Sequence, residues 1–195
     1  MKKKALICNS IIVLLEIISL ILYGIKQHSL SLEFYTMESN LLALITSLLF
    51  IIIRNDNKEF IRDLRFLTTS CLTVTFLVTL FVLLPMMNFN FKFLFFQNQS
   101  LFFHAVCPII SIISYTCFEK RSKKEYLGCL YTSIYGFIMI ILNILDKIVG
   151  PYPFLRVKDQ SIIASILWSI IIIGGSYGIG LLLNTLNKKR KGAKN

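Results

Sequence analysis

The chain has 195 residues, 55% of them hydrophobic and only 16% charged, and its mean hydropathy is +0.71. This composition lies far from that of soluble domains and predicts an integral membrane protein. The formal net charge of +11 does not indicate a nucleic-acid partner, because the basic residues flank apolar runs, where they suit anionic lipid headgroups. We therefore expect membrane lipids as partners and no nucleic acid.

Six apolar runs follow one another along the chain, over residues 5–24, 34–53, 66–87, 101–118, 126–148 and 161–186. Each is close to the roughly 20 residues that a helix needs to cross about 30 Å of hydrocarbon. The linkers between the runs are too short to hold a soluble domain. The sequence thus predicts an all-α fold, in which residues 1–195 form one polytopic six-helix membrane domain with a basic tail at 187–195.

The basic residues indicate how these helices are oriented. Most of the 21 lysines and arginines lie near the two ends of the chain and in the linkers after the second and fourth runs. Because cytoplasmic loops are enriched in Lys and Arg, both termini are expected in the cytoplasm. The linker over residues 54–65 is expected to be a solvated connector. Richness in Ile, Lys and Asn is typical of a bacterial protein, so we expect a multi-pass protein of the plasma (inner) membrane.

The first run follows a lysine cluster, as in a signal peptide, but it has no small-residue cleavage site and carries Glu16 in its middle. We expect a retained first helix in which Glu16 is an intramembrane acid. The five cysteines lie in or beside apolar runs without C-x-x-C spacing, and one of the two histidines, His28, falls in a linker. Neither pattern is that of a metal site or a disulfide framework. No metal, cofactor or disulfide is therefore expected.

Several polar residues are expected at one depth, in the outer leaflet. Because a helix rises about 1.5 Å per residue, His104 should lie about one turn below the outer boundary of the fourth helix. The other members of this layer lie early in the second helix or late in the fifth: Thr36, Glu38, Ser39, Asn40, Asn143 and Asp146. Pro108 lacks the N–H that would bond the carbonyl of His104, so a kink is expected there. Ionisable groups inside a span indicate a functional site by default.

These residue types suit nucleophilic catalysis. A hydroxyl of Thr36 or Ser39 becomes nucleophilic when a base such as His104 takes its proton, and an acid of the same layer, Asp146 or Glu38, would orient the imidazole. The amide of Asn40 would donate a hydrogen bond to a developing oxyanion. The motifs of soluble enzymes, such as a nucleophile elbow, a P-loop or a zinc-protease helix, do not occur in the sequence.

Three segments resemble bacterial relatives of the androgen-induced protein family of membrane threonine hydrolases, which includes the androgen-dependent TFPI-regulating protein. They are FYTMESNLLALI (34–45), HAVCP (104–108) and PYPFLRVKD (151–159). The resemblance extends to helix count and order over essentially the whole chain. It implies six transmembrane helices and an intramembrane threonine and histidine that cleave fatty acid esters of hydroxy fatty acids. The histidine maps to His104 and the threonine to Thr36.

The chain departs from the family pattern at two places. The animal pattern has Asn or Asp three residues after its threonine, whereas Asn40 is four residues after Thr36. Ser39 therefore remains an alternative nucleophile. Arg156 follows Leu155 where the bacterial branch often has aspartate, which removes a carboxylate from that loop.

We expect a hydrolase of lipid esters, with two alternatives. A protein that binds or transports a small ligand would use the same polar layer, with Glu16 extending the path inward, although no inverted repeat is evident. In a structural or regulatory membrane protein, His104 would simply be hydrogen-bonded within the bundle.

Overall fold

The computed structural model describes residues 3–27, 31–97 and 99–192, and His28 lies outside this part. The described residues are helical with connecting turns and contain no strand, which confirms the all-α class. The long helices are α1 (Lys3–Gln27), α2 (Tyr35–Ile53), α3 (Glu59–Val78), α6 (Cys107–Cys117), α7 (Leu127–Ile144) and α8 (Ile162–Gly192). The short elements are η1 (Thr79–Leu83), α4 (Leu84–Met86), α5 (Phe91–Phe95), η2 (Phe102–Val106), η3 (Pro153–Leu155) and η4 (Val157–Asp159).

Among the described residues, five helices are long and apolar enough to cross a membrane: Lys3–Lys26, Tyr35–Ile53, Glu59–Met86, Leu127–Ile144 and Ile162–Lys188. A sixth apolar helix, Phe102–Cys117, is shorter. Large apolar side chains are exposed along most of these helices, as expected for surfaces that face lipid. The chain is therefore a multi-pass membrane protein.

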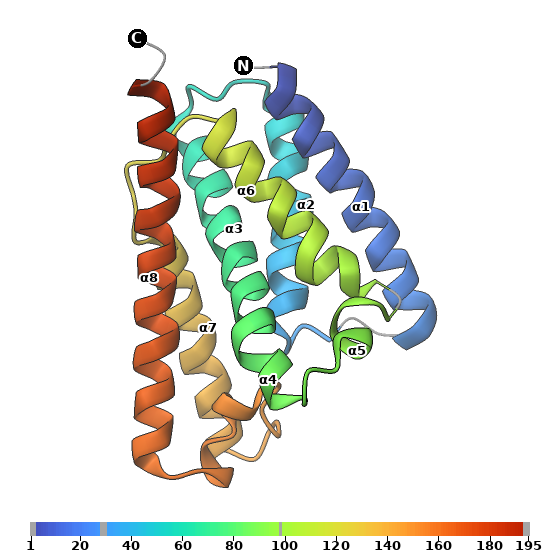
Figure 1. Cartoon of the computed structure of the whole chain (residues 1–195), viewed down its shortest axis with the longest axis vertical. Coiled ribbons are helices and arrows are strands. Elements are labelled where there is room, and N and C mark those ends of the chain that lie inside the picture. Colours follow the sequence, from blue (N-terminus) through green and yellow to red (C-terminus); the bar gives the residue numbers. More distant parts are fainter. Residues whose placement is uncertain (1–2, 28–30, 98, 193–195) are drawn as a thin grey trace.

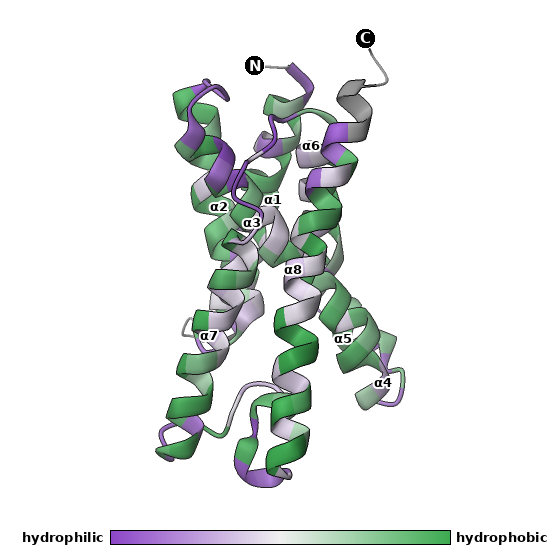
Figure 2. Ribbon diagram, turned by 90° about the vertical axis from the view of Figure 1, so that its left-hand side faces the viewer, coloured by the Kyte–Doolittle hydropathy of each residue, from purple (hydrophilic) through white to green (hydrophobic). Residues whose placement is uncertain are grey.

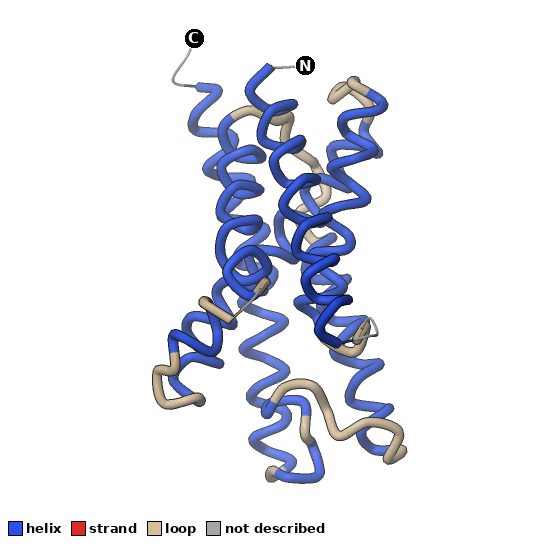
Figure 3. The backbone as a smooth tube through the Cα atoms, turned by 90° about the vertical axis from the view of Figure 1, so that its right-hand side faces the viewer, coloured by secondary structure: helices blue, strands red, loops and turns tan. Residues whose placement is uncertain are grey.

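The helices run side by side, and both ends of the chain lie at the same end of the bundle (Figure 1). Hydrophilic residues gather at this end, and the parts of the helices farther from it are mostly hydrophobic (Figure 2). At the opposite end the helices splay apart and are joined by irregular loops (Figure 3). Helix α3 is central, because it contacts α2, α6, α7 and α8, whereas α1 packs against α2 and α6.

Hydroxyl side chains hold α3 against its neighbours. The Oγ1 atoms of Thr68 and Thr46 are 2.9 Å apart, and on another face Thr69 Oγ1 lies 2.8 Å from Ser111 Oγ of α6. These side chains are buried. Small polar residues let helices approach closely in lipid and hydrogen-bond across the interface, which is the packing role that the threonines of this helix suggest.

The third helix begins earlier than its apolar run predicts. It starts at Glu59 rather than at residue 66, so the expectation that 54–65 is a solvated connector is wrong for its second half. The physical reason is Arg65, whose side chain is only 1% exposed and forms an ion pair with Glu119. A charged residue with a buried partner can lie inside a helix bundle, although its hydropathy places it in a loop.

Two further boundaries differ from the apolar runs. Helix α7 ends at Ile144 rather than near residue 148, because the Nδ2 atom of Asn143 donates hydrogen bonds to the carbonyls of Ile148 and Val149 as the chain turns back. Helix α8 continues through residues expected in the basic tail and ends at Gly192. Residues 193–195 lie outside the described part.

The kink expected at Pro108 takes the form of a widened turn. The π-helical segment η2 (Phe102–Val106) ends two residues before Pro108, and η1 (Thr79–Leu83) ends two residues before Pro85. A proline cannot donate the hydrogen bond that would continue an α-helix. Widened turns of this kind are frequent at functional sites, and His104 lies in the middle of η2.

Candidate functional site

The first turn of α2 is capped by tyrosines from distant parts of the chain. Its N-cap residue, Phe34, provides no side-chain cap. Instead, the N–H of Tyr35 donates to the hydroxyl of Tyr135 at 3.1 Å, and the N–H of Thr36 donates to the hydroxyl of Tyr152 at 3.2 Å. Helix α7 and the loop before α8 thus satisfy amides that a helix start leaves unpaired.

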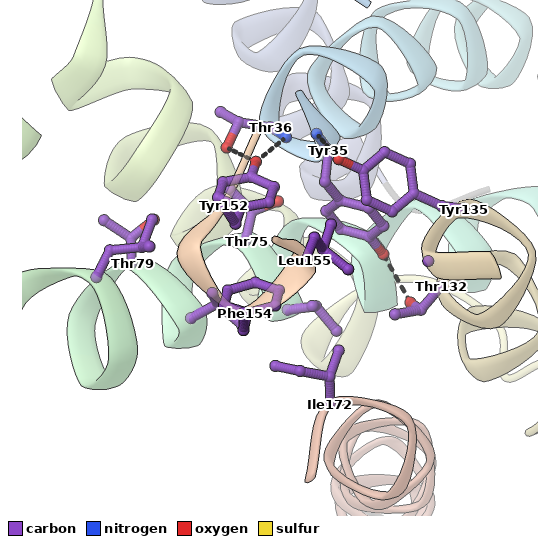
Figure 4. Close-up of a pocket in the computed structure, with 14 residues that line it drawn as sticks. Tyr35, Thr36, Thr75, Thr79, Thr132, Tyr135, Tyr152, Phe154, Leu155 and Ile172 are labelled. Atoms are coloured by element: carbon purple, nitrogen blue, oxygen red, sulfur yellow. Dashed lines mark hydrogen bonds between the residues drawn. The ribbon is translucent and has the colours of Figure 1, made fainter. Parts of the chain in front are cut away.

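A small cavity lies below this capped turn (Figure 4). Its volume is about 40 Å³, which is room for a few water molecules. Its walls combine hydroxyl groups with apolar side chains: Tyr35, Thr36, Val74, Thr75, Val78, Thr79, Leu83, Thr132, Tyr135, Gly136, Tyr152, Phe154, Leu155 and Ile172. Thr36 is therefore one of several hydroxyl-bearing residues that line this cavity.

The hydroxyl of Thr36 is paired with Tyr152. The two oxygens are 3.3 Å apart, and the same phenol oxygen accepts the Thr36 N–H (Figure 4). Burial raises the pKa of the Tyr152 phenol, so this group keeps its proton at neutral pH. Because the phenol oxygen already accepts one hydrogen bond, its O–H is the natural donor toward the Thr36 hydroxyl or toward another acceptor in the cavity.

His104 is oriented by the backbone of the segment before it. Its Nδ1 atom lies 2.6 Å from the carbonyl oxygen of Leu94, and the ring of Phe95 meets the imidazole edge-on at 6.3 Å. A carbonyl only accepts, so Nδ1 carries the hydrogen. In the neutral ring, Nε2 then carries the lone pair. The imidazole is thus held in the tautomer that can accept a proton at Nε2.

Asn40 links the turn of Thr36 to the turn of His104. Its Nδ2 atom donates to the carbonyl of Thr36 at 2.7 Å and to the carbonyl of Phe103, the residue before His104, at 3.3 Å. Both hydrogens of this amide are therefore used by the backbone, so in this structure Asn40 acts as a clamp between α2 and η2. Within the described residues, no hydrogen bond joins the Thr36 hydroxyl to His104.

The side chains of Glu38 and Ser39, which follow Thr36 on α2, do not line the cavity. The Oγ of Ser39 is buried between the carbonyl of Thr36 at 3.1 Å and the hydroxyl of Thr75 at 2.9 Å, outside the lining of the cavity. Glu38 accepts a hydrogen bond of 2.9 Å from the hydroxyl of Tyr131 on α7. Neither side chain reaches His104 through a hydrogen bond in the described part of the chain.

The polar residues at the end of α7, Asn143 and Asp146, form no hydrogen bond with Thr36 or His104 in the described part of the chain. Asn143 turns the chain after the helix, as described above. Asp146 lies beyond the helix end at a φ of 56°, and its side chain is 80% exposed and paired with Lys158 at 2.5 Å. Asp146 therefore does not orient the imidazole of His104, because α7 ends before it and its carboxylate pairs with Lys158 instead. Glu16, on α1, is fully buried inside the bundle.

The sequence alone does not mark Tyr152 as a site residue. This tyrosine belongs to the segment PYPFLRVKD, whose position between two apolar runs suggests only an outer loop. In the structure this loop folds back, and Tyr152, Phe154 and Leu155 are buried against the cavity. Hydropathy does not indicate this re-entry, although the high aromatic content of the segment is consistent with it.

An apolar groove between α7 and α8 leads from the outer surface toward the cavity. A hollow of about 180 Å³ shares Thr132, Gly136, Phe154, Leu155 and Ile172 with the cavity wall. A wider, more open hollow of about 850 Å³ continues it along both helices, past Ile140, Ser169 and Ile173. The cavity therefore lies at the inner end of a groove whose walls are mostly aliphatic.

Comparisons with known proteins identify no relative. No protein-family model matches the chain, no curated protein matches it, and no solved structure matches its fold.

Proposed function

We propose that the chain crosses a bacterial plasma membrane six times, with both termini in the cytoplasm. The shorter helix Phe102–Cys117 would be the sixth crossing. An even number of crossings agrees with chain ends that lie at the same end of the bundle (Figure 1). The basic residues near that end favour the cytoplasmic side.

We further propose that the protein hydrolyses lipid esters, with Thr36 as nucleophile. The observation that carries this proposal is the groove between α7 and α8, which adjoins the cavity that Thr36 helps to line. An acyl chain fits such an aliphatic groove, and the ester would then lie among the hydroxyl groups at its inner end. No cofactor is needed for this chemistry.

In the proposed reaction, the Thr36 oxygen attacks the ester carbonyl carbon and its proton passes to Nε2 of His104. The imidazolium then protonates the leaving alcohol, and water hydrolyses the acyl-threonine. The hydroxyl of Tyr152 would donate a hydrogen bond to the carbonyl oxygen as negative charge develops there. The proposal requires Nε2 to come within hydrogen-bond reach of Thr36 when the substrate is bound.

The test is ester hydrolysis by the purified protein in lipid nanodiscs, together with labelling by a fluorophosphonate probe. Thr36→Val removes the hydroxyl, and His104→Asn keeps a donor toward the Leu94 carbonyl while removing the base. Both should lose at least about 100-fold in turnover. Thr185→Val changes an exposed hydroxyl of α8 that bonds its own backbone at Leu181, outside the cavity, and should retain activity. Hydrolysis and labelling that survive in both Thr36→Val and His104→Asn would refute the assignment.

Binding of a small ligand without chemistry is the second candidate. It is favoured by the pairing of Thr36 with Tyr152 and of His104 with a backbone carbonyl, which leaves the two residues without a direct hydrogen bond. This alternative predicts that a fatty acid stabilises the protein against heat, that Gly136→Trp in the groove abolishes the effect, and that ester turnover is absent.

A further inference from the structure

Glu16 of α1 lies fully buried inside the bundle. Its side chain is 0% exposed, and neither oxygen has a hydrogen-bond partner of normal geometry among the described residues. An ionised carboxylate in an apolar interior is costly unless a positive charge or several donors compensate it. Here the described protein groups supply neither.

The packing of α1 against α2 shows which residues share the level of Glu16. Ile12 of α1 and Ala43 of α2 belong to one buried cluster, and the two consecutive helices run antiparallel (Figure 1). One turn along α1 from Ile12 to Glu16 therefore corresponds to about one turn back along α2, from Ala43 to Asn40. From α6, the Cys107 thiol lies against Glu16.

Asn40 presents an oxygen that is buried and unpaired as well. Its Nδ2 atom donates to the carbonyls of Thr36 and Phe103, which fixes the orientation of the amide. The Oδ1 atom must then point away from both carbonyls, and it has no partner within the described residues. Glu16 and Asn40 thus bring three oxygen atoms, none with a hydrogen-bond partner of normal geometry among the described residues, to one level of the core formed by α1, α2 and α6.

We propose that Glu16 and Asn40 bind a monovalent cation in the middle of the membrane domain. Carboxylate and amide oxygens are the ligands that hard cations such as Na⁺ prefer. One positive charge balances the single carboxylate, whereas a divalent ion would leave an excess charge in the interior. The described residues contain no group of three or more His, Cys, Asp or Glu that would hold a divalent metal.

The experiment measures thermal unfolding of the purified protein in detergent with NaCl, KCl or choline chloride at equal ionic strength. Na⁺ should raise the wild-type Tm by about 3 °C or more relative to choline, because a ligand that binds only the folded state stabilises it. Glu16→Gln, which is neutral and nearly isosteric, should abolish this rise. Ser19→Ala should retain it, since Ser19 is buried on the same helix but donates to its own backbone at Leu15.

A second measurement does not depend on a variant. A hydrophobic carbodiimide modifies protonated carboxyl groups, and the modified residue is identified by mass spectrometry. Na⁺ should slow modification of Glu16, because the bound ion displaces the proton that the reagent needs. The proposal is overturned if Na⁺ leaves both the wild-type Tm and the modification of Glu16 unchanged, or if Glu16→Gln responds to Na⁺ as the wild type does. Ester turnover enters neither measurement, so this site and the proposed hydrolase stand or fall separately.

Discussion

The guanidinium of Arg65 and the carboxylate of Glu119 form an ion pair at 3.1 Å, with side chains only 1% and 2% exposed. Arg65 also donates to Ser47 of α2 and Ser111 of α6. Glu119 accepts further hydrogen bonds from the hydroxyl of Ser114 and from the amide of Asn9 on α1. One pair of charges thus connects α1, α2, α3 and α6, near the end of the bundle where the chain termini lie.

Removing one partner of this pair should strongly destabilise the fold. Arg65→Met leaves the Glu119 carboxylate buried without a cation, which costs about 3–5 kcal/mol of unfolding free energy. The double variant Arg65→Met/Glu119→Met removes both charges and should regain most of that loss. Thermal and denaturant unfolding in detergent measure both effects.

The matched control is the ion pair between Arg121 and Glu125, whose side chains are 37% and 29% exposed. Arg121→Met should cost less than about 1 kcal/mol, because solvent screens exposed pairs. Equal losses for Arg65→Met and Arg121→Met would show that the buried pair contributes no more than a surface pair.

Tyr152→Phe should weaken the start of α2. The variant removes the acceptor of the Thr36 N–H and the partner of the Thr36 hydroxyl. By analogy with the loss of a helix cap, the cost should be about 1–2 kcal/mol. Hydrogen exchange should show faster opening at Thr36, whereas exchange in α8 stays as in the wild type. A variant with unchanged protection at Thr36 would contradict the capping role of Tyr152.

The phenol of Tyr152 should also make the unfolding free energy depend on pH in the alkaline range. Burial raises the pKa of Tyr152 in the folded protein, so above about pH 10, the ordinary value for tyrosine, the unfolded chain ionises first. The folded state then binds more protons than the unfolded state, and stability falls as pH rises. Between about pH 9 and 11, the wild type should lose more unfolding free energy than Tyr152→Phe. If the unfolding free energies of the wild type and Tyr152→Phe fell in parallel with pH, ionisation of this phenol would not contribute to the loss of stability.

Gly128 of α7 packs closely against Ser70 of α3. A Cβ added there would lie 2.4 Å from the Cβ of Ser70. Gly128→Ala should therefore destabilise the protein by about 1–3 kcal/mol, and the double variant Gly128→Ala/Ser70→Gly should be more stable than Gly128→Ala alone. Gly136→Ala, on the same helix but with nothing within 4 Å of the added atom, should be neutral or stabilising by up to about 1 kcal/mol. Equal effects at the two glycines in thermal unfolding would rule out the close contact.

The sequence by itself determines the class of the protein and the approximate positions of its helices. Apolar runs of nearly membrane length are local features, and the cost of unpaired backbone in lipid leaves helix as the structure for each of them. The widened turn near Pro108 was foreseeable as a kink for the same kind of local reason, because a proline removes one specific hydrogen bond.

Only the tertiary structure decides which polar residues meet. Depth in the membrane places Thr36, His104 and Asp146 in one layer, but the rotation of each helix and the point where it ends set the contacts. Helix α7 ends before Asp146, so this carboxylate turns outward to Lys158, while the re-entrant loop brings Tyr152 to Thr36. By hydropathy, Arg65 is expected in a loop. In the folded bundle, however, its partner Glu119, more than fifty positions later in the chain, lies beside it. Pairing of distant charges and hydroxyls depends on how whole helices pack, and hydropathy along the chain does not contain that information.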